Sequence, residues 1–95
     1  MINSYMLRSK LLSKMNINRE EIGLILKELI FFSNSFNKLS PKDMEEKLIE
    51  RLNELNKINK YKPRIYKEVT IIIKDCILIC ELEKEYIFRR AKYAL

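Results

Sequence analysis

The segment that decides the fold is residues 40–58, SPKDMEEKLIERLNELNKI. It opens with Ser40 and Pro41, a strong helix start, because serine can cap free backbone N–H groups and proline at the first helical position sacrifices no hydrogen bond. Apolar side chains then recur at intervals of four, four, three and three, at Met44, Leu48, Leu52, Leu55 and Ile58. This spacing predicts an amphipathic helix. The charged residues that we expect outside its apolar seam are Glu45, Glu46, Glu50, Arg51 and Glu54.

Two further helices are expected before this segment. Residues 4–15 place apolar side chains on one stripe, at Met6, Leu7, Leu11, Leu12 and Met15. A second helix is expected over residues 19–32, because Asn18 and Glu21 have the spacing of a capping box. Its apolar face comprises Ile22, Ile25, Leu26, Leu29, Ile30 and Phe32. The polar run 33–35 predicts a turn, after which Phe36 and Leu39 can cover the core.

The last third of the chain allows two interpretations. Residues 56–63 are polar and basic and predict a connector, and Pro63 opens the final element. From residue 64 to 94, apolar and small residues recur at helical spacing, at Ile65, Val69, Ile72, Ile73, Cys76, Ile79, Cys80, Ile87, Ala91 and Ala94. A single helix is favoured. However, residues 69–79 are rich in β-branched side chains, so a hairpin turning at Lys74 and Asp75 is the alternative.

The composition points to one helical domain. The chain has 95 residues, one glycine and two prolines, which is too few turn residues for a sandwich or a barrel. We expect an all-α fold, a small bundle of about four helices over residues 1–95 with a long C-terminal helix. The N-terminus lacks a signal-peptide pattern and no apolar run is long enough to span a bilayer, so we expect a cytoplasmic protein without membrane contact.

The sequence offers little for catalysis. Histidine is absent, which removes the usual acid–base residue near neutral pH. Cys76 and Cys80 share a helical face, but no nearby Cys or His completes a zinc site, so buried core thiols are expected. The carboxylates of residues 43–54 alternate with lysine and arginine, as on a solvated face. We therefore expect no enzyme activity, no cofactor and no metal.

Basic residues are concentrated in patches, and the net charge is +6. Residues 57–67 contain no acid and intersperse cations with tyrosines, a pattern suited to phosphate contact and base stacking. The candidate nucleic-acid site comprises Lys57, Lys60, Tyr61, Lys62, Arg64 and Lys67. The simpler interpretation is that these cations sit in loops and at helix ends, where they meet the negative pole of the helix dipole.

From Leu39 onward the sequence resembles the helical domain of the GINS replication-complex family, especially its archaeal members. Residues 39–44, LSPKDM, are similar to that domain's leucine, proline-bearing turn and short acidic–apolar helix start. A basic loop and a long helix ending in residues 85–95, EYIFRRAKYAL, follow as in the family, although Glu85 stands where a basic residue is more typical. The resemblance covers residues 39–95. It implies a non-catalytic subunit of a helical assembly that links the replicative helicase to other replisome parts.

The leading functional hypothesis is a non-catalytic interaction protein. Ile71, Leu78 and Leu82 fall off the main apolar stripe of the long final helix, which predicts an exposed patch for a protein partner or for self-association. The candidate partner-binding residues are Ile71, Leu78, Leu82, Phe88, Arg89 and Arg90. The alternative is a small basic protein of viral or plasmid origin that binds DNA or RNA through residues 57–67, as a regulator or an inhibitor of host machinery.

Overall fold

The computed structural model describes residues 4–15, 20–36 and 38–93, and within them the chain is a bundle of four helices. The helices are α1 (Ser4–Met15), α2 (Glu20–Ser33), α3 (Pro41–Asn59) and α4 (Pro63–Tyr93). The predicted all-α fold with a long C-terminal helix is confirmed. The hairpin alternative is wrong, because residues 69–79 lie inside the single 31-residue helix α4. The expected cap at Asn18 lies outside the described residues, as does Ala94.

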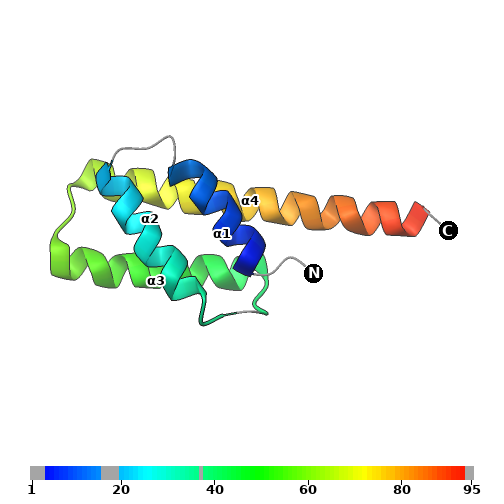
Figure 1. Ribbon diagram of the computed structural model, residues 1–95, viewed down its shortest axis with the longest axis horizontal. Coiled ribbons are helices and arrows are strands. Elements are labelled where there is room, and N and C mark those ends of the chain that lie inside the picture. The colour runs from blue at the N-terminus through cyan, green and yellow to red at the C-terminus, as the bar shows by residue number, and fades with distance from the viewer. Residues whose placement is uncertain (1–3, 16–19, 37, 94–95) are drawn as a thin grey trace.

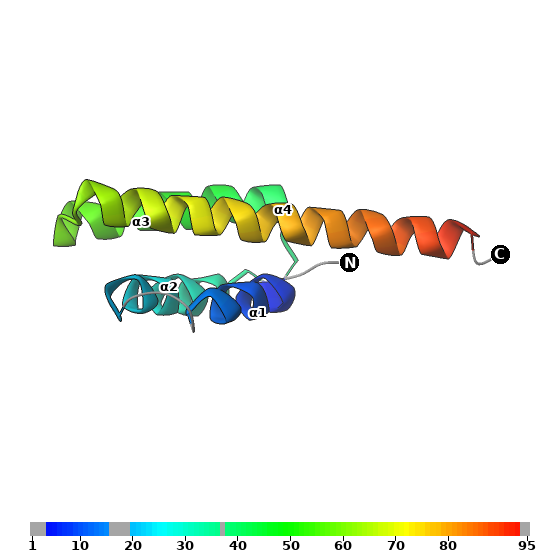
Figure 2. The same cartoon turned by 90° about the horizontal axis from the view of Figure 1, so that it is seen from above.

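The four helices form two layers. Figure 2 shows α3 and α4 side by side in one layer and α1 and α2 in the other. The core lies between the layers and takes side chains from all four helices. Its largest fully buried apolar side chains are Leu11, Ile22, Leu26, Leu29, Met44, Leu48, Leu52, Val69, Ile73, Cys76 and Cys80. Phe36 and Leu39 pack against this core from the α2–α3 connector, as predicted.

Both ends of α3 are fixed by local hydrogen bonds. The Ser40 hydroxyl accepts a hydrogen bond from the backbone N–H of Asp43 at 3.2 Å, and Pro41 follows in the first turn. At the other end Lys60 adopts a left-handed conformation, with φ 49° and ψ 61°, and its N–H donates to the Asn56 carbonyl at 2.8 Å. The predicted cap is therefore confirmed. The C-terminal stop is a left-handed residue of the kind usually supplied by glycine.

Among the side chains that the structure describes, two residues of the predicted apolar stripes are exposed, Leu12 and Ile58. Leu12 is exposed because Leu11 already occupies the buried face of α1, and one residue turns the helix by about 100°. Ile58 is 74% exposed. It stands in the last turn of α3, which in Figure 1 extends beyond the start of α2 and so has no layer above it.

The region predicted as a basic connector is mostly helix. α3 continues to Asn59 and α4 begins at Pro63, so only residues 60–62 are irregular. The prediction of a loop over residues 56–63 was therefore too long. Polar side chains of the last turn of α3 are stable in the helix because they project into solvent, where they cost no burial.

Candidate interaction surface

The side of α4 that faces away from the bundle carries three large aliphatic side chains. Ile71 is 49% exposed, Leu78 54% and Leu82 55%. They are seven and four residues apart, so at about 100° per residue they fall close to one line along the helix. The buried side chains of α4, among them Val69, Ile73 and Cys76, lie on the opposite side. We call Ile71, Leu78 and Leu82 the outer stripe. Their predicted exposure is confirmed.

The C-terminal part of α4 extends past the rest of the bundle. Figures 1 and 2 both show the end of α4 projecting beyond α1, α2 and α3, and the molecule is 52 Å long but only 25 by 18 Å across. An ion pair marks where the projection begins, because Lys10 of α1 lies 2.8 Å from Glu83 of α4. We call residues 85–93 the overhang.

The overhang combines aromatic and basic side chains in solvent. Phe88 is 70% exposed, and Tyr86 is also exposed with the Arg90 guanidinium 5.9 Å from its ring centre. Arg89 donates to the Glu85 carboxylate at 2.8 Å, one helical turn away. Such a segment leaves apolar surface in water that a partner could bury. The side chain of Ile87, which the sequence placed on the apolar stripe, lies outside the part of the chain that the structure describes.

A groove runs between α3 and α4 beside the outer stripe. Its volume is about 610 Å³, and its lining includes the half-buried Ile49. The α4 side contributes Thr70 and Lys74. The α3 side contributes Lys42 and four carboxylates, Asp43, Glu45, Glu46 and Glu50. The groove is therefore acidic on one wall. Sequence reasoning treated these carboxylates only as a solvated face, because their position beside α4 depends on how the two helices pair.

The candidate nucleic-acid residues are spread over three elements. Lys57 is in the last turn of α3, Lys60, Tyr61 and Lys62 form the connector, and Arg64 and Lys67 are in the first turns of α4. All five cations are exposed. Arg64 and Lys67 precede Ile71 by seven and four residues, so they continue the line of the outer stripe and do not face the connector.

The connector faces acidic residues of α2. Lys60, Tyr61 and Lys62 line a cleft of about 480 Å³ together with Glu21 and Glu28. A phosphate entering this cleft would meet two carboxylates as well as two lysines, which weakens its attraction. The opposite charges come together only in the folded chain. This arrangement favours Arg64 and Lys67 over Lys60 and Lys62 as phosphate contacts.

The tyrosines of the basic segment are used in the fold. Tyr61 is half-buried; its N–H donates to the Asn56 side-chain oxygen at 3.0 Å, and its hydroxyl accepts from Asn59 at 3.2 Å. The Tyr66 hydroxyl donates to the Asn53 side-chain oxygen and so joins α4 to α3. Both rings pack against the core. Neither ring is therefore fully open for stacking on a base.

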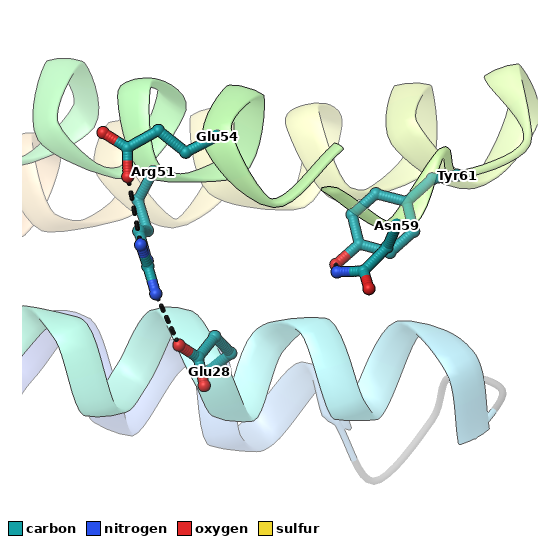
Figure 3. A network of polar contacts seen from close by, with 5 residues as sticks. All are labelled: Glu28, Arg51, Glu54, Asn59 and Tyr61. Carbon is teal, nitrogen blue, oxygen red and sulfur yellow. Dashed lines mark hydrogen bonds and ion pairs between the residues drawn. The ribbon is translucent and has the colours of Figure 1, made fainter. Parts of the chain in front are cut away.

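Arg51 connects the two layers, a role that the sequence did not indicate. Figure 3 shows its guanidinium between Glu54 on its own helix and Glu28 on α2, with Asn59 and Tyr61 farther along. The two ion-pair distances are 3.0 Å to Glu54 and 2.9 Å to Glu28. The hydrogen bonds to these carboxylates raise the pKa of Arg51. The guanidinium also lies 5.6 Å from the ring centre of Phe32. This network stabilises the packing of α3 on α2.

The two cysteines are core side chains, as predicted. Cys76 and Cys80 are free and buried. Burial, assisted by the neighbouring Cys80 thiol, raises the pKa of Cys76 to about 11, and burial also raises the pKa of Cys80. Thiols in this state are poor nucleophiles near neutral pH. Among the described side chains, no group of three or more His, Cys, Asp or Glu is placed to hold a metal ion.

The geometry thus offers surfaces for binding: an aliphatic stripe, an aromatic–basic overhang and an acidic groove, all on or beside α4. Among the described residues, no helix has the length and apolar character needed to cross a bilayer. Comparison of the chain with protein-family models, with curated proteins and with solved structures found no match.

Proposed function

We propose that this chain is a non-catalytic interaction module that binds a helical surface of another protein molecule through α4. The single observation that carries this proposal is the outer stripe and its continuation into the overhang. Ile71, Leu78, Leu82 and Phe88 are each about half or more exposed. Their exposure is costly, since taking a fully exposed side chain of this size out of water gains roughly 1.5–3 kcal/mol and covering the exposed half of one gains about half of that. A helix that keeps such a row in water is best explained by a partner that covers it.

The test compares two variants of the full chain as bait in an extract of the native host treated with nuclease. In Leu78→Glu/Leu82→Glu the outer stripe carries two charges. In the control, Leu24→Glu, the charge replaces an exposed leucine on α2, 63% exposed against 54% for Leu78 and 55% for Leu82. We expect specific proteins, or further copies of the chain, to be retained by wild type and by the control and lost from the stripe variant. Equal retention by all three would overturn the proposal.

A more specific form of this proposal is a GINS-like subunit of a DNA replication complex. It is supported by the resemblance over residues 39–95 alone. It predicts that components of the replicative helicase co-purify with wild type and are lost from the stripe variant. Retention of other proteins only would remove this specific form and leave the general one intact.

Direct nucleic-acid binding is the second candidate. The observation that favours it is the exposed pair Arg64 and Lys67 on the outer side of α4, away from the carboxylates of α2. Affinity for a labelled single strand should fall steeply as salt rises, because bound cations release counterions from the phosphates. Arg64→Gln/Lys67→Gln should weaken binding more than Lys60→Gln/Lys62→Gln. Binding that is absent at low salt, or equal for both variants, would contradict this candidate.

A further inference from the structure

We propose that the outer stripe is covered by α4 of a second copy of this chain, running antiparallel, with each overhang lying over the acidic groove of the other copy. This inference rests on the proposed function and names its partner. Three observations support it: the limited area of the stripe, the position of the groove along the length of α4, and the charges on the overhang and the groove.

The first observation concerns area. A stable interface buries roughly 800 Å² on each partner, and three half-exposed aliphatic side chains fall well short of that. A second helix that covered only Ile71, Leu78 and Leu82 would therefore bind weakly. The overhang must be covered too, since it is the adjoining part of α4 that exposes aromatic rings. A pairing that buries both the stripe and the overhang comes closer to that area than one that buries the stripe alone.

The second observation concerns which residues of the two antiparallel α4 helices lie opposite each other. When Leu78 is placed opposite Leu82 of an antiparallel second copy, residues equally far from this centre come level with each other. Seven residues outward, Ile71 is level with Arg89 of the second copy. Residues 85–90 of the overhang are then level with residues 70–75 of α4. The α4 wall of the groove is formed by Thr70 and Lys74, so the overhang comes to lie beside the groove.

The direction in which Phe88 projects agrees with this placement. It follows Thr70 by eighteen residues, which is five full helical turns, so both lie on the same side of α4. Antiparallel helices related by a two-fold axis bring the same side of each together. Phe88 of the second copy is therefore directed towards the groove, whose lining offers the half-buried Ile49 as an apolar contact.

The third observation is charge complementarity. The α3 wall of the groove carries four carboxylates, Asp43, Glu45, Glu46 and Glu50. The overhang brings the exposed Arg89, which follows Ile71 by eighteen residues and so lies on the line of the outer stripe beside the groove, whereas Arg90 projects to the other side of α4. Glu85 of the second copy comes level with Asp75, but the Arg89 that holds it at 2.8 Å and the neighbouring Lys74 offset that like charge. A parallel pair would instead stack Arg89 on Arg89 and Asp75 on Asp75, and it would leave the groove open.

The first test is the molar mass of the purified full chain by sedimentation velocity across a range of concentrations. We expect wild type and the Leu24→Glu control to dimerise. The dimer dissociation constant of Leu78→Glu/Leu82→Glu should be at least tenfold higher. Circular dichroism of each variant establishes that the monomer is still folded. A wild type that stays monomeric at all concentrations would overturn this inference.

The second test addresses the groove and the orientation. Glu46→Lys/Glu50→Lys and Arg89→Glu should each weaken the dimer. A mixture of the two variants should recover affinity, because in the mixed dimer each groove again meets an overhang residue of opposite charge. For orientation, Ile71→Cys should form a disulfide with Arg89→Cys when the two chains are mixed, and not with itself. The native thiols can stay because they are buried. A disulfide of Ile71→Cys with itself would overturn the antiparallel arrangement.

These outcomes separate the inference from the proposed function. If the chain is monomeric but retains host proteins that are lost from the Leu78→Glu/Leu82→Glu variant, the partner is not a second copy, and the proposed interaction module stands. A monomeric chain with no stripe-dependent partner would remove both.

Discussion

The guanidinium of Arg51 on α3 lies 2.9 Å from the carboxylate of Glu28 on α2, a residue 23 positions earlier in the sequence. The same side chain crosses the ring of Phe32 on α2, with 5.6 Å between the guanidinium carbon and the ring centre. Arg51 therefore joins the two layers in two ways, by charge and by contact of its aliphatic and planar parts with an apolar ring.

Substitutions of Arg51 should separate these two contributions. Arg51→Met keeps an apolar stem over Phe32 and loses the ion pairs, whereas Arg51→Ala loses both. We expect Arg51→Ala to lower the melting temperature more than Arg51→Met, measured by circular dichroism in low salt. Glu54→Gln, which removes only the carboxylate on the same helix, should have the smallest effect of the three. Equal melting temperatures for the methionine and alanine variants would show that packing over Phe32 contributes nothing.

The apolar residues of α3 should contribute unequally to the free energy of unfolding. Leu52 is completely buried and Ile58 is 74% exposed, although both belong to the same helical stripe. Leu52→Ala should lower the free energy of unfolding by about 2–5 kcal/mol, because a cavity remains where the side chain was. Ile58→Ala should change it by less than about 0.5 kcal/mol. Urea denaturation measures both, and a large loss for Ile58→Ala would place that residue in the core after all.

Replacing Lys60 with glycine should stabilise the fold. Among the described residues it is the only non-glycine with a positive φ, at 49°. An L-residue in this conformation carries a steric cost that glycine avoids, and this gain exceeds the backbone entropy that glycine adds to the unfolded chain. Lys60→Gly should therefore raise the free energy of unfolding by about 0.5–1 kcal/mol. Lys62→Gly, two residues later in the connector, is the matched control and should lower it or leave it unchanged.

The buried thiols should make the fold sensitive to alkaline pH. A cysteine in the unfolded chain ionises with a pKa near 9.0, whereas that of Cys76 in the fold is raised to about 11. The contribution of the neutral thiol is thus fully present below pH 9 and is lost as the pH rises towards 11. The free energy of unfolding should fall over this range in wild type and fall less in Cys76→Ala. The same slope in both proteins would contradict this assignment. Below pH 8, labelling of either thiol should require opening of the core.

Local sequence determined the four helices and the start of α3. The Ser40–Pro41 start of α3 depends only on a hydroxyl reaching an N–H three residues away, and it is present as expected. The helix over residues 63–93 follows from apolar spacing, with no glycine or proline inside the helix to interrupt it. The β-branched residues within it did not produce a hairpin, because α-helical spacing buries Val69, Ile72 and Ile73 together against the bundle.

Local sequence also indicated the outer stripe, since Ile71, Leu78 and Leu82 stood off the main apolar face of α4. Their partner was left open, because a periodic pattern says which side chains share a line and not what covers it. The basic segment was interpreted less well. Its cations were predicted to lie in a loop, but most of them lie in α3 or α4. The two lysines of the connector, Lys60 and Lys62, line a cleft with Glu21 and Glu28.

Only the tertiary structure decided which parts of each stripe are covered. Leu55 and Ile58 differ by three residues and by one turn of helix, yet one is buried and the other exposed, because α3 is longer than the layer above it. The same holds for the end of α4, which projects because α1, α2 and α3 stop short of it. The acidic groove, the Lys10–Glu83 pair and the Arg51–Glu28 pair likewise join residues distant in sequence. Helical periodicity acts over three or four residues, whereas coverage depends on where other helices begin and end.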